Sequence, residues 1–94
     1  MNKGELVHAI AVKAQVSQKL ADTILTAMLD IIVEAVDQGE KVSFVGFGTF
    51  EARQRQARTG QNPKTGEKLE IPATTVPAFS PGKGFKDRVA ANGQ

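Results

Sequence analysis

The chain has 94 residues, of which 40% are hydrophobic and 23% charged, with no cysteine or tyrosine and a single histidine. This is the length of one domain, and the composition argues against a disulfide framework, a metal site and the common nucleophile–base pairs of enzymes. No targeting segment or long apolar run is present, so we expect a cytoplasmic protein that is not an enzyme and uses no cofactor, metal, membrane or small-molecule substrate.

Charge is divided unevenly along the sequence. Residues 1–50 carry four basic and six acidic side chains, whereas residues 51–94 carry eight basic and four acidic ones. The positive potential therefore belongs to the second half, where it can attract a polyanion.

Two amphipathic helices are predicted in residues 1–39. Asn2 with Glu5 resembles a capping box for the first helix, Ser17 can cap the second, and Gly39 ends it. The apolar stripe of the second helix consists of Leu20, Ala21, Ile24, Leu25, Met28, Leu29, Ile32, Ala35 and Val36. It is wider than one short helix can cover, which predicts that residues 1–39 bury it against a second copy of the chain.

Strands are predicted in residues 40–52 and 76–79, because the apolar period changes after Gly39. Gly46 and Gly48 allow a tight turn around Phe47. We expect the phenylalanines to form a core that is shared with the helical stripe. The residues predicted for this dimer core are Leu25, Met28, Leu29, Ile32, Phe44, Phe47, Phe50 and Phe79.

Residues 53–75 are predicted to form a basic two-stranded ribbon. Apart from Pro63, the stretch between Phe50 and Leu69 has no apolar side chain larger than alanine, and no acid lies between Glu51 and Glu67. A ribbon of this kind cannot pack on a core and is marginally stable alone. Its charge favours a phosphate backbone as the partner, and its width suits a DNA groove.

A projecting ribbon leaves about 70 residues for the core, a size at which one core rarely supplies more than roughly 3 to 5 kcal/mol. Without disulfides or metals, association is the remaining source of stability, most simply as a homodimer. A short C-terminal helix is predicted over residues 80–91, with Ser80 as its cap and Pro81 in its first turn.

Several motifs at fixed spacing resemble the bacterial histone-like DNA-binding proteins of the HU/IHF family, closest to HU. They are Met1-Asn2-Lys3, Val45-Gly46-Phe47-Gly48-Thr49-Phe50, Arg55, Arg58-Thr59-Gly60, Asn62-Pro63, Thr65-Gly66, Val76-Pro77-Ala78-Phe79 and Gly82-Lys83. The resemblance implies an α+β fold: an intertwined homodimer, or a heterodimer with a related subunit, with a helical base, a three-stranded antiparallel sheet per chain and a protruding two-stranded β-ribbon arm.

The resemblance also implies a function, the binding of double-stranded DNA with little sequence preference, and a place in the nucleoid. The arms would enter the minor groove, with Pro63 as a wedge between base pairs, and would bend and compact the DNA. The implied DNA-binding residues are Lys3, Arg53, Arg55, Arg58, Gln61, Asn62, Pro63, Lys64, Lys68, Lys83 and Lys86. The sequence departs from the common family pattern at Gln61, Thr75 and Gly84.

Two alternatives remain open at this point. The chain could be a sequence-specific architectural factor like IHF, which reads DNA through its deformability. It could also be an RNA or single-strand binding module that stacks bases on the phenylalanines.

Overall fold

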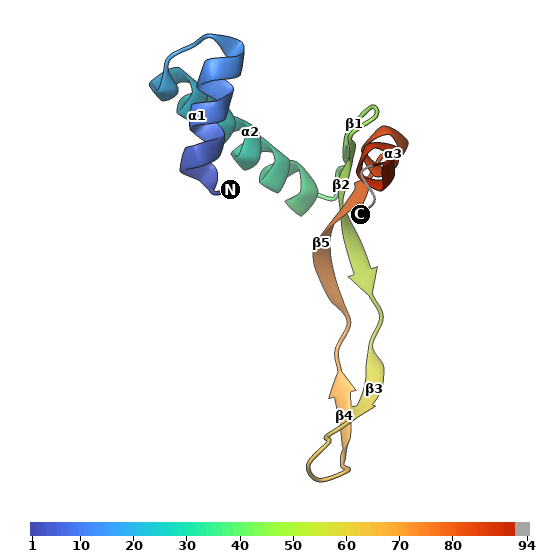
Figure 1. The fold of residues 1–94 in the computed structure, drawn as a ribbon. Helices are drawn as coiled ribbons and strands as arrows, with labels where there is room; N and C mark the ends of the chain where they lie inside the picture. The colour runs from blue at the N-terminus through green and yellow to red at the C-terminus, as the bar shows by residue number, and fades with distance from the viewer. Residues whose placement is uncertain (92–94) are drawn as a thin grey trace. The chain divides into compact units, whose positions relative to one another are not determined.

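The computed structural model of the chain describes residues 1–91 (Figure 1). Its elements are α1 (Lys3–Ala14), α2 (Gln18–Asp37), β1 (Val42–Phe44), β2 (Gly48–Arg55), β3 (Arg58–Gln61), β4 (Lys68–Ile71), β5 (Thr74–Pro81) and α3 (Lys83–Ala91). The predicted α+β class is confirmed. Two compact units make up the chain, Met1–Glu34 and the part from Ala35 onward. None of the described helices is long and apolar enough to cross a membrane.

The helices of the first unit begin where local hydrogen bonding predicts. The side chain of Asn2 accepts a hydrogen bond from the Glu5 N–H at 2.9 Å, and Ser17 Oγ accepts one from the Leu20 N–H at 3.0 Å. Each cap satisfies an N–H that has no partner inside its helix. Both predicted helix starts are confirmed.

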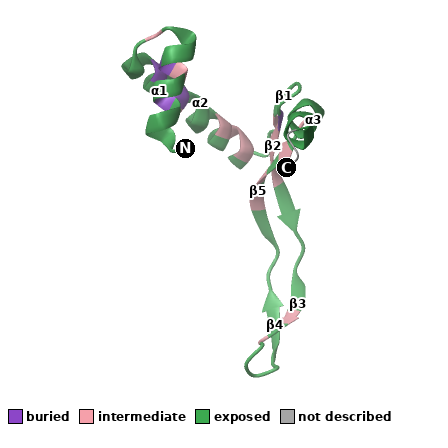
Figure 2. Cartoon of the chain, viewed as in Figure 1, coloured by how far each residue is buried: buried purple, intermediate pink, exposed green. Residues whose placement is uncertain are grey.

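A small core joins α1 to α2 in this unit (Figure 2). Its buried side chains are Val7, Ala11, Ala21 and Leu25, with Ile10 and Val16 packed against them. At the edge of this core, His8 Nδ1 and Gln18 Nε2 lie 2.8 Å apart in a hydrogen bond between the helices. The only histidine of the sequence therefore has a structural contact.

Much of the apolar stripe on α2 remains uncovered. Leu25 is buried by its own chain, but Met28 and Leu29 are 44% and 43% exposed and Ile24 is 56% exposed. Monomeric proteins rarely leave a contiguous apolar surface of this kind open to water. The stripe is therefore available to a partner, as the sequence predicts.

The second unit is built on a three-stranded antiparallel sheet in the order β1-β2-β5. Phe50 pairs with Phe79 in the β2–β5 ladder, and their ring centroids are 4.8 Å apart. Phe47 contacts the rings of Phe44, Phe79 and Phe85 at centroid distances of 6.1, 5.5 and 5.4 Å. All five phenylalanines thus belong to one cluster, which we call the ring cluster.

Gly48 makes the close packing of the ring cluster possible. Its φ is +155°, and a Cβ atom there would lie 2.5 Å from the ring of Phe79 and 2.7 Å from the Ser80 carbonyl oxygen. No larger residue fits without moving the strand that pairs with it. The glycine predicted from the turn pattern is therefore required mainly by packing.

The predicted start of the C-terminal helix is wrong. Ser80 and Pro81 belong to β5, and α3 begins at Lys83. Ser80 pairs with Thr49 in the sheet, and its hydroxyl accepts a hydrogen bond from Arg53 instead of from a helix N–H. Ladder pairing has overridden a local capping signal.

Tertiary contacts hold the first turn of α3, which glycine at position 84 weakens relative to alanine. The Phe85 N–H donates to the Gly46 carbonyl oxygen at 3.2 Å. A Cβ atom at Gly84 would lie 3.0 Å from the same oxygen, which gives a steric reason for glycine at this position.

Candidate nucleic-acid interface

The predicted ribbon is present, and we call residues 53–75 the arm. Strands β3 and β4 pair from Arg58 with Ile71 to Gln61 with Lys68. A two-stranded ribbon implies one continuous strand on each side, and this is wrong: the strands are interrupted between Arg55 and Arg58 and between Ile71 and Thr74. Pro72 lies in the interruption of the returning strand and has no N–H to donate to the ladder. Two residues lie between β2 and β3, and two lie between β4 and β5. The β2–β5 pair and the β3–β4 pair therefore have the same register.

The tip of the arm is ordered by its own hydrogen bonds. The Asn62 side chain accepts one from the Lys64 N–H at 2.9 Å, spanning Pro63. The Asn62 N–H donates to the Glu67 carbonyl oxygen at 2.8 Å, and the Gly66 N–H donates to the Asn62 carbonyl oxygen at 2.7 Å. This is an Asx-type turn closed across its base. It leaves Pro63 exposed at the tip.

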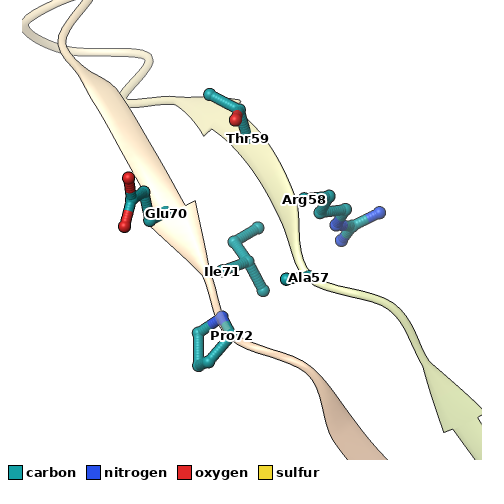
Figure 3. A pocket seen from close by; sticks show the side chains of 6 residues that line it. All are labelled: Ala57, Arg58, Thr59, Glu70, Ile71 and Pro72. Atoms are coloured by element: carbon teal, nitrogen blue, oxygen red, sulfur yellow. The ribbon is translucent and has the colours of Figure 1, made fainter.

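The arm also has an apolar strip that sequence reasoning did not assign to the site. Leu69 and Ile71 are 46% and 38% exposed, and the Ile71 side chain approaches Gly60 on the facing strand. Figure 3 shows Ile71 between the two strands, with Arg58 and Glu70 extending away from it. Alternation of Leu69 and Ile71 along β4 was the available sequence signal.

Most of the predicted cations of the arm are exposed and unpaired. Arg55, Arg58, Lys64 and Lys68 take part in no ion pair within residues 1–91. Gln61, beside them in β3, is exposed as well. A side chain that is already solvated and has no partner can turn to a phosphate without breaking an existing contact.

Two other residues predicted to contact DNA already have polar partners within the chain. In the first unit, Lys3 Nζ donates to Thr26 Oγ1 at 2.8 Å and lies 3.6 Å from Asp22 Oδ1. At the root of the arm, Arg53 Nε donates to Glu51 Oε1 at 3.0 Å. Lys83 and Lys86 on α3 are exposed and make no ion pair in the described part of the chain.

This arrangement changes the titration of Glu51. The hydrogen bond from Arg53 lowers the pKa of Glu51, and the charge of Lys41 acts in the same direction, against an opposing effect of desolvation. Lys41 Nζ lies 3.7 Å from Glu51 Oε2. Sequence reasoning assigned no role to Lys41 or Glu51, because the contact between Lys41, just before β1, and Glu51 in β2 appears only when the two strands pair.

In chemical terms, the arm is a cationic ribbon whose tip carries a rigid apolar ring. Charged side chains along such a ribbon can neutralise phosphates, and an exposed apolar tip can enter between base pairs. Among residues 1–91, no group of three or more histidine, cysteine, aspartate or glutamate side chains is placed to hold a metal ion.

Comparison with known families agrees with this geometry. The sequence profile of the family described as Bacterial DNA-binding protein matches residues 1–90, and the chain belongs to this family of DNA-binding proteins. A relative from a Nostoc species, named DNA-binding protein HU, is 64% identical over 90 residues that cover 96% of each chain. A relative of the same name from Clostridium pasteurianum is 53% identical and covers 95% of this chain and 98% of its own.

Among solved structures, the chain is similar to one described as an Anabaena HU–DNA cocrystal structure. The TM-score is 0.88 at 64% sequence identity, with 96% of this chain and 98% of the other covered. The resemblance noted in the sequence is thus confirmed at the level of the family and the fold.

Proposed function

We propose that this chain is a histone-like protein that binds double-stranded DNA with little sequence preference, and bends and compacts it. The observation that carries the proposal is the arm: exposed, unpaired cations on both strands lead to an ordered turn that presents Pro63. The protein acts by binding and not as an enzyme, and we place it in the cytoplasm on the nucleoid. The relatives named HU and the HU–DNA structure support this proposal.

The binding unit in this proposal is a homodimer, which supplies two arms. The exposed stripe of α2 and the ring cluster, where Phe44 and Phe47 are 40% and 48% exposed, provide the apolar surface that a second copy would bury. A chain of this size gains most of its missing core by association. Sedimentation equilibrium should give twice the mass of the chain, and a monomer would contradict the proposal.

Pro63 is the proposed wedge. Its ring is apolar, its φ is fixed, and it has no N–H that would be left without a partner between bases. Unstacking a base step costs a few kcal/mol, which contacts of the bent DNA with the protein offset. The deciding experiment measures the bend of a short duplex by fluorescence energy transfer at fixed low salt.

In that experiment Pro63→Ala should retain binding and reduce the bend. Pro77→Ala, which changes an exposed proline of β5 outside the tip, serves as the control and should bend DNA as the parent does. An unchanged bend in Pro63→Ala would remove the wedge from the mechanism.

Neutralisation of DNA phosphates by the cations of the protein should contribute most of the binding free energy. The logarithm of the binding constant should then fall with the logarithm of salt concentration, with a slope of about −0.9 per phosphate contact. A flat salt response would contradict this mechanism.

Neither alternative from the sequence is favoured. The packing of Phe47 against three other rings supports its role in the ring cluster over one in stacking bases. The relatives cited above are named HU, which favours nonspecific binding over a site-specific factor. Competition between one candidate site and random DNA would test this, since a specificity ratio above about 10³ would indicate sequence recognition.

A further inference from the structure

The face of the β1-β2-β5 sheet opposite Phe50 and Phe79 carries a polar network at the root of the arm. Side chains alternate across a strand, so Thr49, Glu51 and Arg53 of β2 share this face. Lys41 reaches it just before β1, and Ser80 reaches it from β5, where it pairs with Thr49. Residues just before β1, in β2 and in β5 therefore contribute to the network.

Glu51 is the centre of the network, and each of its carboxylate oxygens contacts a different cation. Oε1 accepts the hydrogen bond from Arg53 Nε at 3.0 Å, and Oε2 lies 3.7 Å from Lys41 Nζ. The Glu51 side chain is only 20% exposed, whereas those of Arg53 and Lys41 are 52% and 71% exposed. The acid is thus fixed against the sheet while both cations remain within reach of solvent.

The Arg53 side chain points back from the arm toward the sheet. Arg53 pairs with Val76, but its guanidinium donates to Ser80 Oγ, which lies four residues along β5 in the direction of the ring cluster. Two acceptors, Glu51 and Ser80, hold the guanidinium in this direction. Arg55, two residues further along the same strand, has no such partner in the described chain.

From this geometry we infer that Glu51 competes with DNA phosphate for Lys41 and Arg53 and so limits the affinity of the proposed DNA-binding surface. The inference rests on the proposed function and adds to it a residue that opposes binding. In the free protein, Lys41 and Arg53 share one carboxylate, whose single negative charge offsets one of their two positive charges. To contact a duplex they must leave that carboxylate, and the freed acid then lies close to the phosphates.

The test compares Glu51→Gln with Glu70→Gln. Both remove one negative charge, but Glu70 lies on β4 and forms no ion pair within residues 1–91. Binding to a short random-sequence duplex is measured by fluorescence anisotropy across a salt series, with melting curves to confirm that each variant folds.

Glu51→Gln should bind up to about fivefold more tightly at low salt, the range expected for release of surface ion pairs. Its salt slope should steepen by about 0.9 to 1.8, for one or two additional phosphate contacts. Glu70→Gln should show less than half of that gain. In a chain that also carries Lys41→Gln and Arg53→Gln, the advantage of Glu51→Gln over Glu70→Gln should vanish.

Ser80→Ala provides a second, independent variant, which decides the matter if Glu51→Gln does not fold. It removes one of the two acceptors that hold Arg53, so it should raise affinity in the same direction but by less. Equal gains for Glu51→Gln and Glu70→Gln, or a gain that persists without Lys41 and Arg53, would overturn the inference while leaving DNA binding intact. Failure of the parent protein to bind the duplex would instead refute the proposed function, and the inference with it.

Discussion

The tip of the arm and the ring cluster lie in the same unit of the chain but are held together by different forces. The tip depends on hydrogen bonds between near neighbours in sequence, such as that from the Lys64 N–H to Asn62. The ring cluster brings together residues from Phe44 to Phe85, which are far apart in sequence. One region is shaped locally and is exposed, and the other is shaped by tertiary contacts.

Because of this difference, we expect the ring cluster to determine the stability of the fold and the arm to determine DNA binding. Substitutions in the ring cluster should affect folding first, because they remove apolar contacts between rings from several elements of the fold. Substitutions in the arm should affect DNA binding with little change in stability, because its cations have few contacts to lose. Four variants test this separation.

The largest effect is expected from Phe79→Ala. Phe79 contacts the rings of Phe47, Phe50 and Phe85, and its loss should reduce the free energy of unfolding by about 3 kcal/mol. Urea unfolding at a fixed protein concentration measures this change. A loss of less than about 1 kcal/mol would show that the ring cluster is not a principal source of stability.

A smaller effect, and on binding alone, is expected from Lys64→Gln. Removing one phosphate contact should make the salt slope shallower by about 0.9. The free energy of unfolding should change by less than about 0.5 kcal/mol. Lys13→Gln on α1 is the matched control, and it should leave the slope unchanged. Equal effects of both substitutions would mean that total charge matters and the position on the arm does not.

The order of the tip is tested by Asn62→Ala. The substitution removes the hydrogen bond across Pro63, which should loosen the turn by about 1 kcal/mol. Hydrogen exchange at the Lys64 N–H should accelerate, and the DNA bend should decrease while the ring cluster stays intact. Unchanged exchange at Lys64 would contradict the assigned turn.

The smallest effect concerns the pH dependence of stability at the root of the arm. The hydrogen bond from Arg53 lowers the pKa of Glu51 in the folded chain. Ionised Glu51 therefore stabilises the fold at pH values above its ordinary pKa, and this contribution is lost as the pH falls through the lowered value. Glu51→Gln should be slightly less stable than the parent at neutral pH, and the two should converge in acid. A constant difference across the titration would exclude a contribution from Glu51 ionisation.

Local sequence signals predicted much of the fold correctly. The caps at Asn2 and Ser17 and the turn around Phe47 are fixed by interactions within a few residues. The basic ribbon was predicted from its composition and turn residues, although its strands pair residues that are further apart, such as Arg58 with Ile71. Ser80-Pro81 is the instructive failure, since the same dipeptide suits a helix start or an edge strand. The pairing of Ser80 with Thr49, which is 31 residues away, decided between them.

The sequence by itself determined the cationic arm, its proline tip and the apolar surplus of the second helix, because composition and short-range spacing suffice to specify them. Only the tertiary structure decided which of the arm's cations form ion pairs within the chain. Arg53 and Arg55 look equivalent in sequence, yet the sheet register places Arg53 against Glu51 and Ser80 and leaves Arg55 without an ion pair in the described chain. Ion pairing depends on distance in space, and that distance is set only when strands remote in sequence align.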